Sequence, residues 1–369
     1  MGMTPRERIL AVFNGEEPDK TPVCVPEDVL RYHPGDWSQR LQERGMGLIR
    51  GTAISQPNMR SSFSGGLIPR LTDVRYTRTD YFEKGVRKYR QTWETPVGSI
   101  TGVMMTNPGD YAAYGYSPTP EEYVIKQPSD WRVVNYFLKD ILDNLVPTYE
   151  GFERAEEEIG DRGVTVPWIY KTAWQRAWIQ LAGPERALID FHEQPDEVQE
   201  YIDLSNRWHT RTAEFAAGCP AKFVNIEENM TDVMTSPKYY REYCLPIYEI
   251  FSKQLAGTGK ILGAHMDGRL GNLKKEIAES PLNVIESFSV PPTGDVSLSE
   301  VKKIWPDKMV FMNTASHLAW AKPEEVRTFY EALAEEWGTK KCLLLELIEQ
   351  LPPETVESHL SAAMDAFGY

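Results

Sequence analysis

The chain is 369 residues long, with 41% hydrophobic residues and a formal net charge of −14. This length exceeds the usual size of a single core, but an α/β barrel reaches it as one domain, and the apolar content is sufficient to fill one. The acidic balance, without a dense block of Lys or Arg, argues against nucleic acid or an anionic membrane surface as the main partner.

Two further features narrow the class of protein. No apolar run reaches the roughly 18 residues of a membrane span, and the amino terminus is polar, so we expect a cytoplasmic protein. The cysteines are scattered without a Cys-x-x-Cys pair, which predicts free thiols and argues against a thiolate-rich structural zinc site. They are Cys24, Cys219, Cys244 and Cys342.

The amino-terminal segment predicts a helix followed by a strand. Thr4 is expected to be the N-cap, with Pro5 at the first helical position and Glu7 three residues after the cap. Gly15 is expected to end this helix. Residues 22–26 then predict the first strand of a barrel.

Residues 27–128 show no regular alternation of helix and strand patterns. Residues 74–80 and 86–95 alternate between polar and apolar side chains, which is typical of an antiparallel ribbon, with residues 96–98 as its turn. We expect residues 60–110 to form a β-ribbon insertion that lies over the functional site. A second domain is the alternative, but the apolar content of this segment is low for an independent core.

From residue 129 onward, the pattern alternates between helices and strands. A helix is predicted over residues 129–158. Short apolar runs predict strands at 164–170, 223–226, 261–264, 283–288, 309–313 and 342–346. Helices are expected up to Leu181 and over 195–216, 238–255, 270–279, 298–304, 323–336 and 354–367. This count predicts an α/β fold, a single (β/α)8 TIM barrel over residues 1–369.

The stretch from Lys260 to Arg269 carries the clearest sign of a functional site. His265 and Asp267 follow an apolar run and are two residues apart, so on an extended strand their side chains point to the same side. The carboxyl ends of barrel strands are where ligands gather. The pair therefore predicts a site for a metal ion or a polar ligand, the alternative being a strand-end histidine that hydrogen-bonds a neighbouring carboxylate.

Several separated segments resemble the uroporphyrinogen decarboxylase superfamily. They are MTPRERILAVFNGEEPDKTPV, SPKYYREYCLPIYEIFSKQL, AHMDG, VIESFSVPPTGDVSLSEVKKIWPDKMVFMNT and LPPETVESHLSAAMDAF. These segments span nearly the whole chain in the order found in the family. The resemblance implies a (β/α)8 barrel, whereas fold alone does not decide the activity.

Members of that superfamily perform two chemistries. The decarboxylases carry an Arg-Gln-Ala-Gly-Arg motif, whose cations hold the carboxylates of the porphyrinogen, and a His-Gly near the final strand. Here residues 25–35 are acidic and lack the paired arginines, and residues 349–353 read Glu-Gln-Leu-Pro-Pro in place of the His-Gly. A substrate rich in carboxylates would lose its guanidinium partners.

The other branch contains zinc-dependent methyltransferases that move a methyl group between a corrinoid protein and a small molecule. Their ligands are a His-x-Cys pair and a later Cys. This chain retains His265 but has Asp267 and Glu349 at or near the cysteine positions. The resemblance thus implies a zinc site of nitrogen and oxygen donors, suited to Lewis-acid chemistry. A shift in register would place Glu346 in the role of Glu349.

The chain looks most like the anaerobic O-demethylase methyltransferases, including in residues 93–98 and 125–131. This likeness implies a methoxylated aromatic donor, cob(I)alamin on a corrinoid partner protein as acceptor, and in-line transfer with zinc or a general acid at the ether oxygen. A uroporphyrinogen-type decarboxylase and a non-catalytic tetrapyrrole-binding barrel remain the alternatives. The sequence leaves open the methyl donor, the docking surface and whether the chain is a homo-oligomer.

Further residues are candidates for the site. Glu228 and Asp267 are expected to be catalytic, while Glu227 is expected to be a surface residue. Asn313 is expected to bind substrate or to cap the next helix. Aromatic residues predict an apolar slot for an aromatic ring or the corrin, although the two that lie four residues apart also fit ordinary helix packing. These aromatic residues are Trp168, Tyr170, Trp174 and Trp178.

Overall fold

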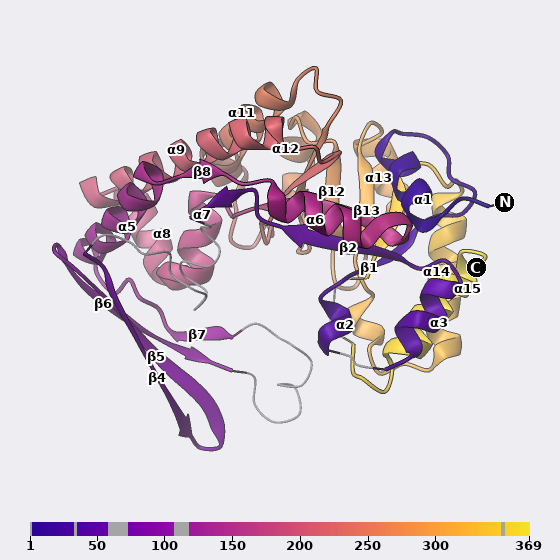
Figure 1. The fold of residues 1–369 in the computed structure, drawn as a ribbon, viewed down its shortest axis with the longest axis horizontal. Helices are drawn as coiled ribbons and strands as arrows, with labels where there is room; N and C mark the ends of the chain where they lie inside the picture. Colours follow the sequence, from indigo (N-terminus) through magenta and orange to yellow (C-terminus); the bar gives the residue numbers. More distant parts are fainter. Residues whose placement is uncertain (1, 33–34, 58–72, 107–117, 348–350) are drawn as a thin grey trace.

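The computed structural model describes residues 2–32, 35–57, 73–106, 118–347 and 351–369. Its centre is a closed barrel of parallel strands, in the order β1-β14-β13-β12-β11-β10-β9-β2 (Figure 1). These strands are β1 Val23–Pro26, β2 Gly47–Thr52, β9 Gly163–Ile169, β10 Phe223–Ile226, β11 Ile261–His265, β12 Val284–Phe288, β13 Met309–Met312 and β14 Leu343–Glu346. The predicted (β/α)8 barrel is confirmed.

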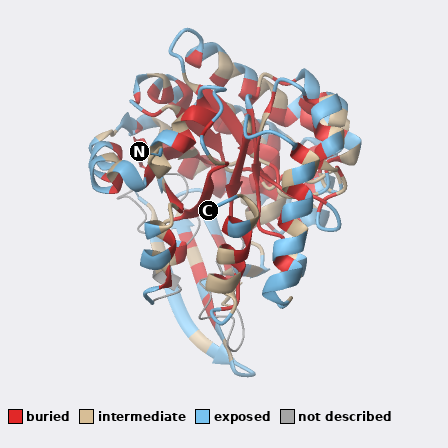
Figure 2. Cartoon of the chain, turned by 90° about the vertical axis from the view of Figure 1, so that its right-hand side faces the viewer, coloured by how far each residue is buried: buried red, intermediate tan, exposed pale blue. Residues whose placement is uncertain are grey.

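Helices surround the barrel, with exposed outer faces and a buried layer of strands within (Figure 2). The α-helices are α1 Pro5–Phe13, α2 Val29–Tyr32, α3 Trp37–Glu43, α5 Trp131–Asp143, α6 Glu150–Ile159, α7 Ala173–Arg176, α8 Gly183–Glu193, α9 Asp196–Gly218, α10 Pro237–Tyr239, α11 Leu245–Leu255, α12 Lys274–Glu279, α13 Leu298–Ile304, α14 Pro323–Trp337 and α15 Val356–Ala366. Two π-helical turns, η4 Ala177–Leu181 and η5 Tyr240–Cys244, extend α7 and precede α11.

Helix α1 closes the amino-terminal end of the barrel. Its start is fixed by the predicted capping box, in which Thr4 and Glu7 bond each other's backbone N–H groups. Its apolar residues, among them Phe13, pack with Phe223 and Phe311 from the barrel lumen, with ring centroids 5.3 and 5.6 Å from that of Phe13. The lower lumen is therefore a packed apolar core, and the chemistry is confined to the other end.

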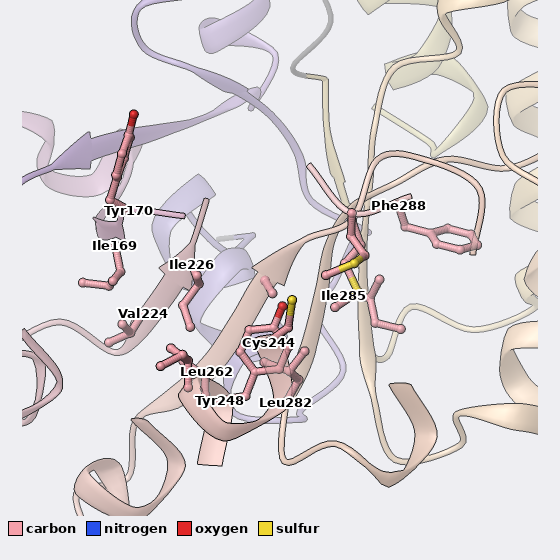
Figure 3. Packing of buried hydrophobic residues seen from close by; sticks show 14 of the residues in the cluster. Ile169, Tyr170, Val224, Ile226, Cys244, Tyr248, Leu262, Leu282, Ile285 and Phe288 are labelled. Carbon is pink, nitrogen blue, oxygen red and sulfur yellow. The ribbon is translucent and has the colours of Figure 1, made fainter. Parts of the chain in front are cut away.

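The outer face of the strands packs against the helical layer. Ile169, Val224, Ile226 and Leu262 belong to one buried cluster with Tyr248 of α11 (Figure 3). Side chains on one strand alternate between this layer and the lumen. The position of each strand-end residue in this alternation therefore decides whether it faces the mouth or the helices.

The structure corrects several predicted elements. The helix expected over 129–158 is divided into α5 and α6, because the chain turns through Asn144 and the short strand β8, Val146–Pro147, which pairs with β3, Ser55–Gln56. Strand β2 was not predicted, because the charged residue Arg50 cuts its apolar run short. In the structure, Arg50 forms an ion pair with Glu27. Helix α8 was also not predicted.

An antiparallel sheet of four strands lies beside α5, on the side of the molecule away from both termini (Figure 1). Its strands are β4 Arg75–Glu83, β5 Val86–Thr95, β6 Gly98–Met105 and β7 Thr119–Glu122. The predicted ribbon and its turn at residues 96–98 are confirmed as β4, β5 and the start of β6. Trp93 and Ile100 of this sheet join the main buried cluster, which attaches the sheet to the barrel. Within the described residues, no helix has the length and hydropathy to span a membrane.

Candidate active site

His265 is the last residue of β11 and is held between two carboxylates. Its register partner on β12 is Glu286, and the His265 Nδ1 atom lies 2.8 Å from Glu286 Oε2. On the other side, His265 Nε2 lies 3.5 Å from Asp267 Oδ2. The predicted same-side placement of His265 and Asp267 is thus observed. Because Glu286 accepts from Nδ1, the Nε2 atom is directed toward Asp267 and the barrel mouth.

The pair is strongly polarised. Burial opposes a charged imidazole, but the negative charges of Glu286 and Asp267 outweigh it and hold the pKa of His265 well above its ordinary value. Burial likewise opposes a charged Asp267, yet the adjacent His265 lowers the pKa of that carboxyl group. The charged forms of His265 and Asp267 therefore stabilise each other.

The lumen beneath His265 carries a second layer of polar groups. Asn225 of β10 donates from Nδ2 to Glu286 Oε2 over 2.9 Å. Glu346, at the end of β14, is 2% exposed. Burial, and then the neighbouring carboxylate of Glu286, raise the pKa of Glu346 well above its ordinary value. The neutral form of Glu346 is therefore favoured beside Glu286, whose carboxylate is hydrogen-bonded to His265.

A line of hydrogen bonds leads from His265 to a cavity. Asn229 Nδ2 donates to Asp267 Oδ2 over 3.3 Å, and Lys171 Nζ donates to Asn229 Oδ1. Lys171 also donates to the backbone carbonyls of Glu227 and Glu228. Since Lys171 and Asn229 line the cavity, a ligand bound there is connected to the imidazole through this network.

The cavity lies between the antiparallel sheet and the loops after β9 and β10, with a volume of about 720 Å³. This is within the range of small-molecule sites. The sheet contributes Tyr89, Gln91 and Trp93, and the barrel side contributes Tyr170 and Trp178. The insertion thus forms one wall of a cavity whose other wall leads to the candidate site.

The predicted aromatic slot is only partly correct. Tyr170 lines the cavity, and its hydroxyl donates to Gln180. Trp168 instead faces the barrel lumen, where it covers Gly51 so closely that a Cβ atom there would lie 2.5 Å from its ring. Trp174 is fully buried among Phe191, Tyr239 and Tyr243 and is not among the described residues that line the cavity, so its position does not support substrate binding. Its helical neighbour Trp178 lines the cavity instead.

Asn313 follows β13 and is buried, and its Oδ1 accepts from the N–H of Thr314 over 2.6 Å. This local bond supports a structural role, as in the capping alternative, although helix α14 begins only at Pro323. Asn313 is not among the described residues that line the cavity.

The two acids after β10 lie in environments opposite to those predicted. Glu228 is completely buried, and its carboxylate accepts from the Thr172 N–H and the Tyr248 hydroxyl, each at 3.3 Å. This carboxylate is directed into the helical layer, so the prediction that Glu228 is catalytic is not supported by its position. Glu227, which was expected to be a surface residue, lines the cavity. The reversal follows from the alternation of side chains at the strand end.

The third predicted metal ligand, Glu349, lies outside the described residues. Its alternative, Glu346, lies in the lumen beside Glu286. Within the described part of the chain, no three His, Cys, Asp or Glu side chains are arranged to hold one metal ion. His265 Nε2 and Asp267 are nevertheless donors suited to zinc, and the Glu286 carboxylate on Nδ1 is the support that zinc-binding histidines require.

Several residues of the network were not predicted from sequence. Asn225, Asn229 and Lys171 are single polar residues in or after strands, and only the alternation of β9 and β10 could have placed them at the mouth. Gln91 reaches the cavity from a sheet whose position relative to the barrel no local pattern encodes.

An eight-stranded barrel with ionisable residues at the carboxyl ends of its strands defines a TIM-barrel protein with an enzyme-like mouth. The sequence model of the family described as uroporphyrinogen decarboxylase (URO-D) matches residues 110–368, and the chain belongs to this family. The structure is similar to that of a methyltransferase from Methanosarcina mazei, with a TM-score of 0.57 and 12% identity over 98% of this chain and 99% of that one. At this identity the likeness concerns the fold. A search of the curated proteins gave no match.

Proposed function

We propose that this chain is a methyltransferase of the uroporphyrinogen decarboxylase family, which transfers a methyl group from a small methoxylated aromatic donor to the cob(I)alamin of a corrinoid protein. The observation that carries this proposal is the acidic, histidine-centred barrel mouth joined by hydrogen bonds to an aromatic-lined cavity. The similarity to a structure named as a methyltransferase agrees with it.

The charge of the site argues against decarboxylation of a porphyrinogen. Such a substrate carries several carboxylates and needs several cations to hold them. Of the described residues that line the cavity, Lys171 alone is a cation, and its ammonium group donates to Asn229 and to two backbone carbonyls. The carboxylates of Asp267 and Glu286 lie nearby at the mouth. A polycarboxylate would therefore be repelled.

Zinc fits the chemistry of this donor set. His265 Nε2 and Asp267 would hold the ion, with Glu349 as the proposed third ligand, because the described acids supply no third donor. When bound, zinc would supply Lewis acidity at the ether oxygen of the donor. Glu286 fixes the orientation of the imidazole, and Asn229 fixes that of Asp267.

The reaction balances without a further reactant. The cobalt of cob(I)alamin forms a bond to the methyl carbon as the carbon–oxygen bond breaks, and the electron pair of that bond leaves on the aryl oxygen. The aryloxide then takes one proton from solvent or from a nearby acid, giving a phenol. The cavity walls orient the ring, so that the methyl group points toward the open mouth.

The test measures both candidate activities in one preparation. Wild type is expected to transfer methyl from methoxyarenes to cob(I)alamin and to leave uroporphyrinogen unchanged. His265→Ala is expected to lower the transfer rate by about 100-fold or more, the usual effect of removing a group that stabilises developing charge. His192→Ala, a change at an exposed histidine of α8, serves as the matched control.

Decarboxylation of uroporphyrinogen by wild type would support the alternative activity. Binding of a tetrapyrrole with neither activity would favour a non-catalytic barrel. Either result overturns the proposal.

A further inference from the structure

The cavity wall contains buried polar atoms of Gln91 and Trp178 that lack a hydrogen-bond partner among the described residues. The Gln91 side chain is 3% exposed, and its Oε1 atom has no hydrogen-bond partner among the described residues. The same holds for Nε1 of Trp178. Both residues line the 720 Å³ cavity. An unpaired buried polar group costs about 1–3 kcal/mol, so its presence at a cavity wall points to a ligand.

The surroundings explain why Gln91 has no protein partner. Its neighbour across the ladder on β6 is Gly102, which has no side chain to meet the amide. Its neighbour on β4 is Arg78, whose guanidinium is paired with Asp80 and lies 3.7 Å from the centre of the Tyr89 ring. Neither of these two neighbours therefore satisfies the Gln91 amide oxygen.

Trp178 differs from most buried tryptophans of this chain. Trp131, Trp174, Trp305 and Trp337 each donate their indole N–H to an oxygen of the protein. Trp208 also lacks a partner, but it is not among the residues that line the cavity. Trp178 lies on the π turn η4, which presents Trp178, Ile179 and Gln180 in succession to the cavity. Such turns are frequent at functional sites.

The charge near the cavity restricts the ligand group. An indole N–H can only donate, whereas a glutamine amide offers both an acceptor and donors. A neutral hydroxyl group can accept from the indole and donate to the amide oxygen. A carboxylate could accept from both, but it would meet the carboxylate of Glu227 in the cavity wall and a Lys171 whose ammonium already serves three oxygens.

We infer that Gln91 and Trp178 form a specificity subsite that recognises a neutral hydroxyl group on the aromatic ring, which makes the preferred ligand a methoxyphenol and excludes a methoxybenzoate. The methoxy group of the ligand is inferred from the proposed function, and to that extent the inference rests on it. Recognition of the hydroxyl group is a binding property, which can be measured whether or not the protein transfers methyl groups.

The experiment measures binding without cobalamin by titration calorimetry, using 2-methoxyphenol, 2-methoxybenzoate and methoxybenzene. Wild type is expected to bind 2-methoxyphenol about 10-fold more tightly than either of the others, which is the effect of one or two net hydrogen bonds. Gln91→Leu and Trp178→Phe are each expected to weaken binding of 2-methoxyphenol by about 5- to 10-fold and to leave methoxybenzene unchanged.

Matched controls make the same chemical changes outside the cavity. Gln39→Leu and Trp320→Phe alter exposed residues and are expected to bind all ligands as wild type does. Equal or tighter binding of 2-methoxybenzoate by wild type would overturn the inference. So would unchanged binding of 2-methoxyphenol by both cavity variants, each checked for folding by circular dichroism.

The two proposals fail separately. Selective binding of 2-methoxyphenol that depends on Gln91 and Trp178, without methyl transfer, would overturn the proposed function and support the subsite. Methyl transfer from 2-methoxybenzoate in preference to 2-methoxyphenol would overturn the subsite and leave the proposed function in place.

Discussion

Glu227 and Glu228 are adjacent in the chain and have opposite environments. Glu227 lines the cavity, whereas Glu228 lies beneath it among Thr172, Tyr248 and Cys244. Burial raises the pKa of Glu228 to about 7, an effect that the bonds from Thr172 and the charge of Lys171 only partly offset. Its carboxyl group is therefore partly protonated near neutral pH and is a structural element of the helical layer.

This placement predicts a pH-dependent stability. The pKa of Glu228 is raised in the folded state from 4.5 to about 7, so the folded state binds more protons than the unfolded state between these values. The stability gained from the protonated group is full below pH 4.5 and is lost as the pH rises to about 7. Glu228→Gln cannot ionise. Relative to wild type, its free energy of unfolding is expected to rise by about 2.5 kcal/mol between pH 5 and pH 8.

Urea unfolding at the two pH values measures this difference. Glu249→Gln, at an exposed position on α11, controls for the loss of one negative charge. A constant difference between wild type and Glu228→Gln at both pH values would contradict the assignment.

At the level of strands, closure of the barrel depends on how β2 approaches β9. Gly163 is paired with Leu48, and a Cβ atom on Gly163 would lie 1.9 Å from the Leu48 carbonyl oxygen. No side chain fits between the strands at this point. Gly163 therefore allows the last pair of strands to close the ring that positions the mouth.

Gly163→Ala is accordingly expected to lower stability by about 3 kcal/mol, at the upper end of the cost of overpacking. The melting temperature is expected to fall by roughly 4 °C. Gly151→Ala is the matched control, because a Cβ atom there meets only Thr52 Oγ1 at 4.0 Å. In α6 it is expected to be neutral or slightly stabilising. A melting temperature unchanged by Gly163→Ala would show that β2 does not close the barrel in this register.

For the whole molecule, sequence periodicity predicted most of the barrel, because each strand from 163 onward is a short apolar run followed by a helix. Strand β2 was not found, since its pairing with β1 and β9 is decided by tertiary contacts and not by a local pattern. His265 and Asp267 were predicted correctly as neighbours, because a strand fixes their common side.

The rest of the site depends on contacts between distant segments. Glu286 meets His265 only because β11 and β12 pair in one register, and Gln91 and Trp178 line one cavity only because the sheet lies against this side of the barrel. Trp174 and Trp178 are the same residue type, four positions apart in one helical stretch, so the sequence does not show which of them lines the cavity. Only the packing of α7 against the helical layer buries Trp174 and leaves Trp178 at the cavity.

The proposed zinc ion at His265 and Asp267 would support methyl transfer at the barrel mouth. The decisive measurement is the rate of methyl transfer from a panel of methoxyarenes to cob(I)alamin, followed by absorbance, with the protein before chelation, after chelation and after zinc is restored. We expect the rate to fall by about 100-fold on chelation and to recover with zinc in wild type, but not to recover in His265→Ala. Transfer at the original rate by protein shown to be free of metal would contradict the proposed role of zinc.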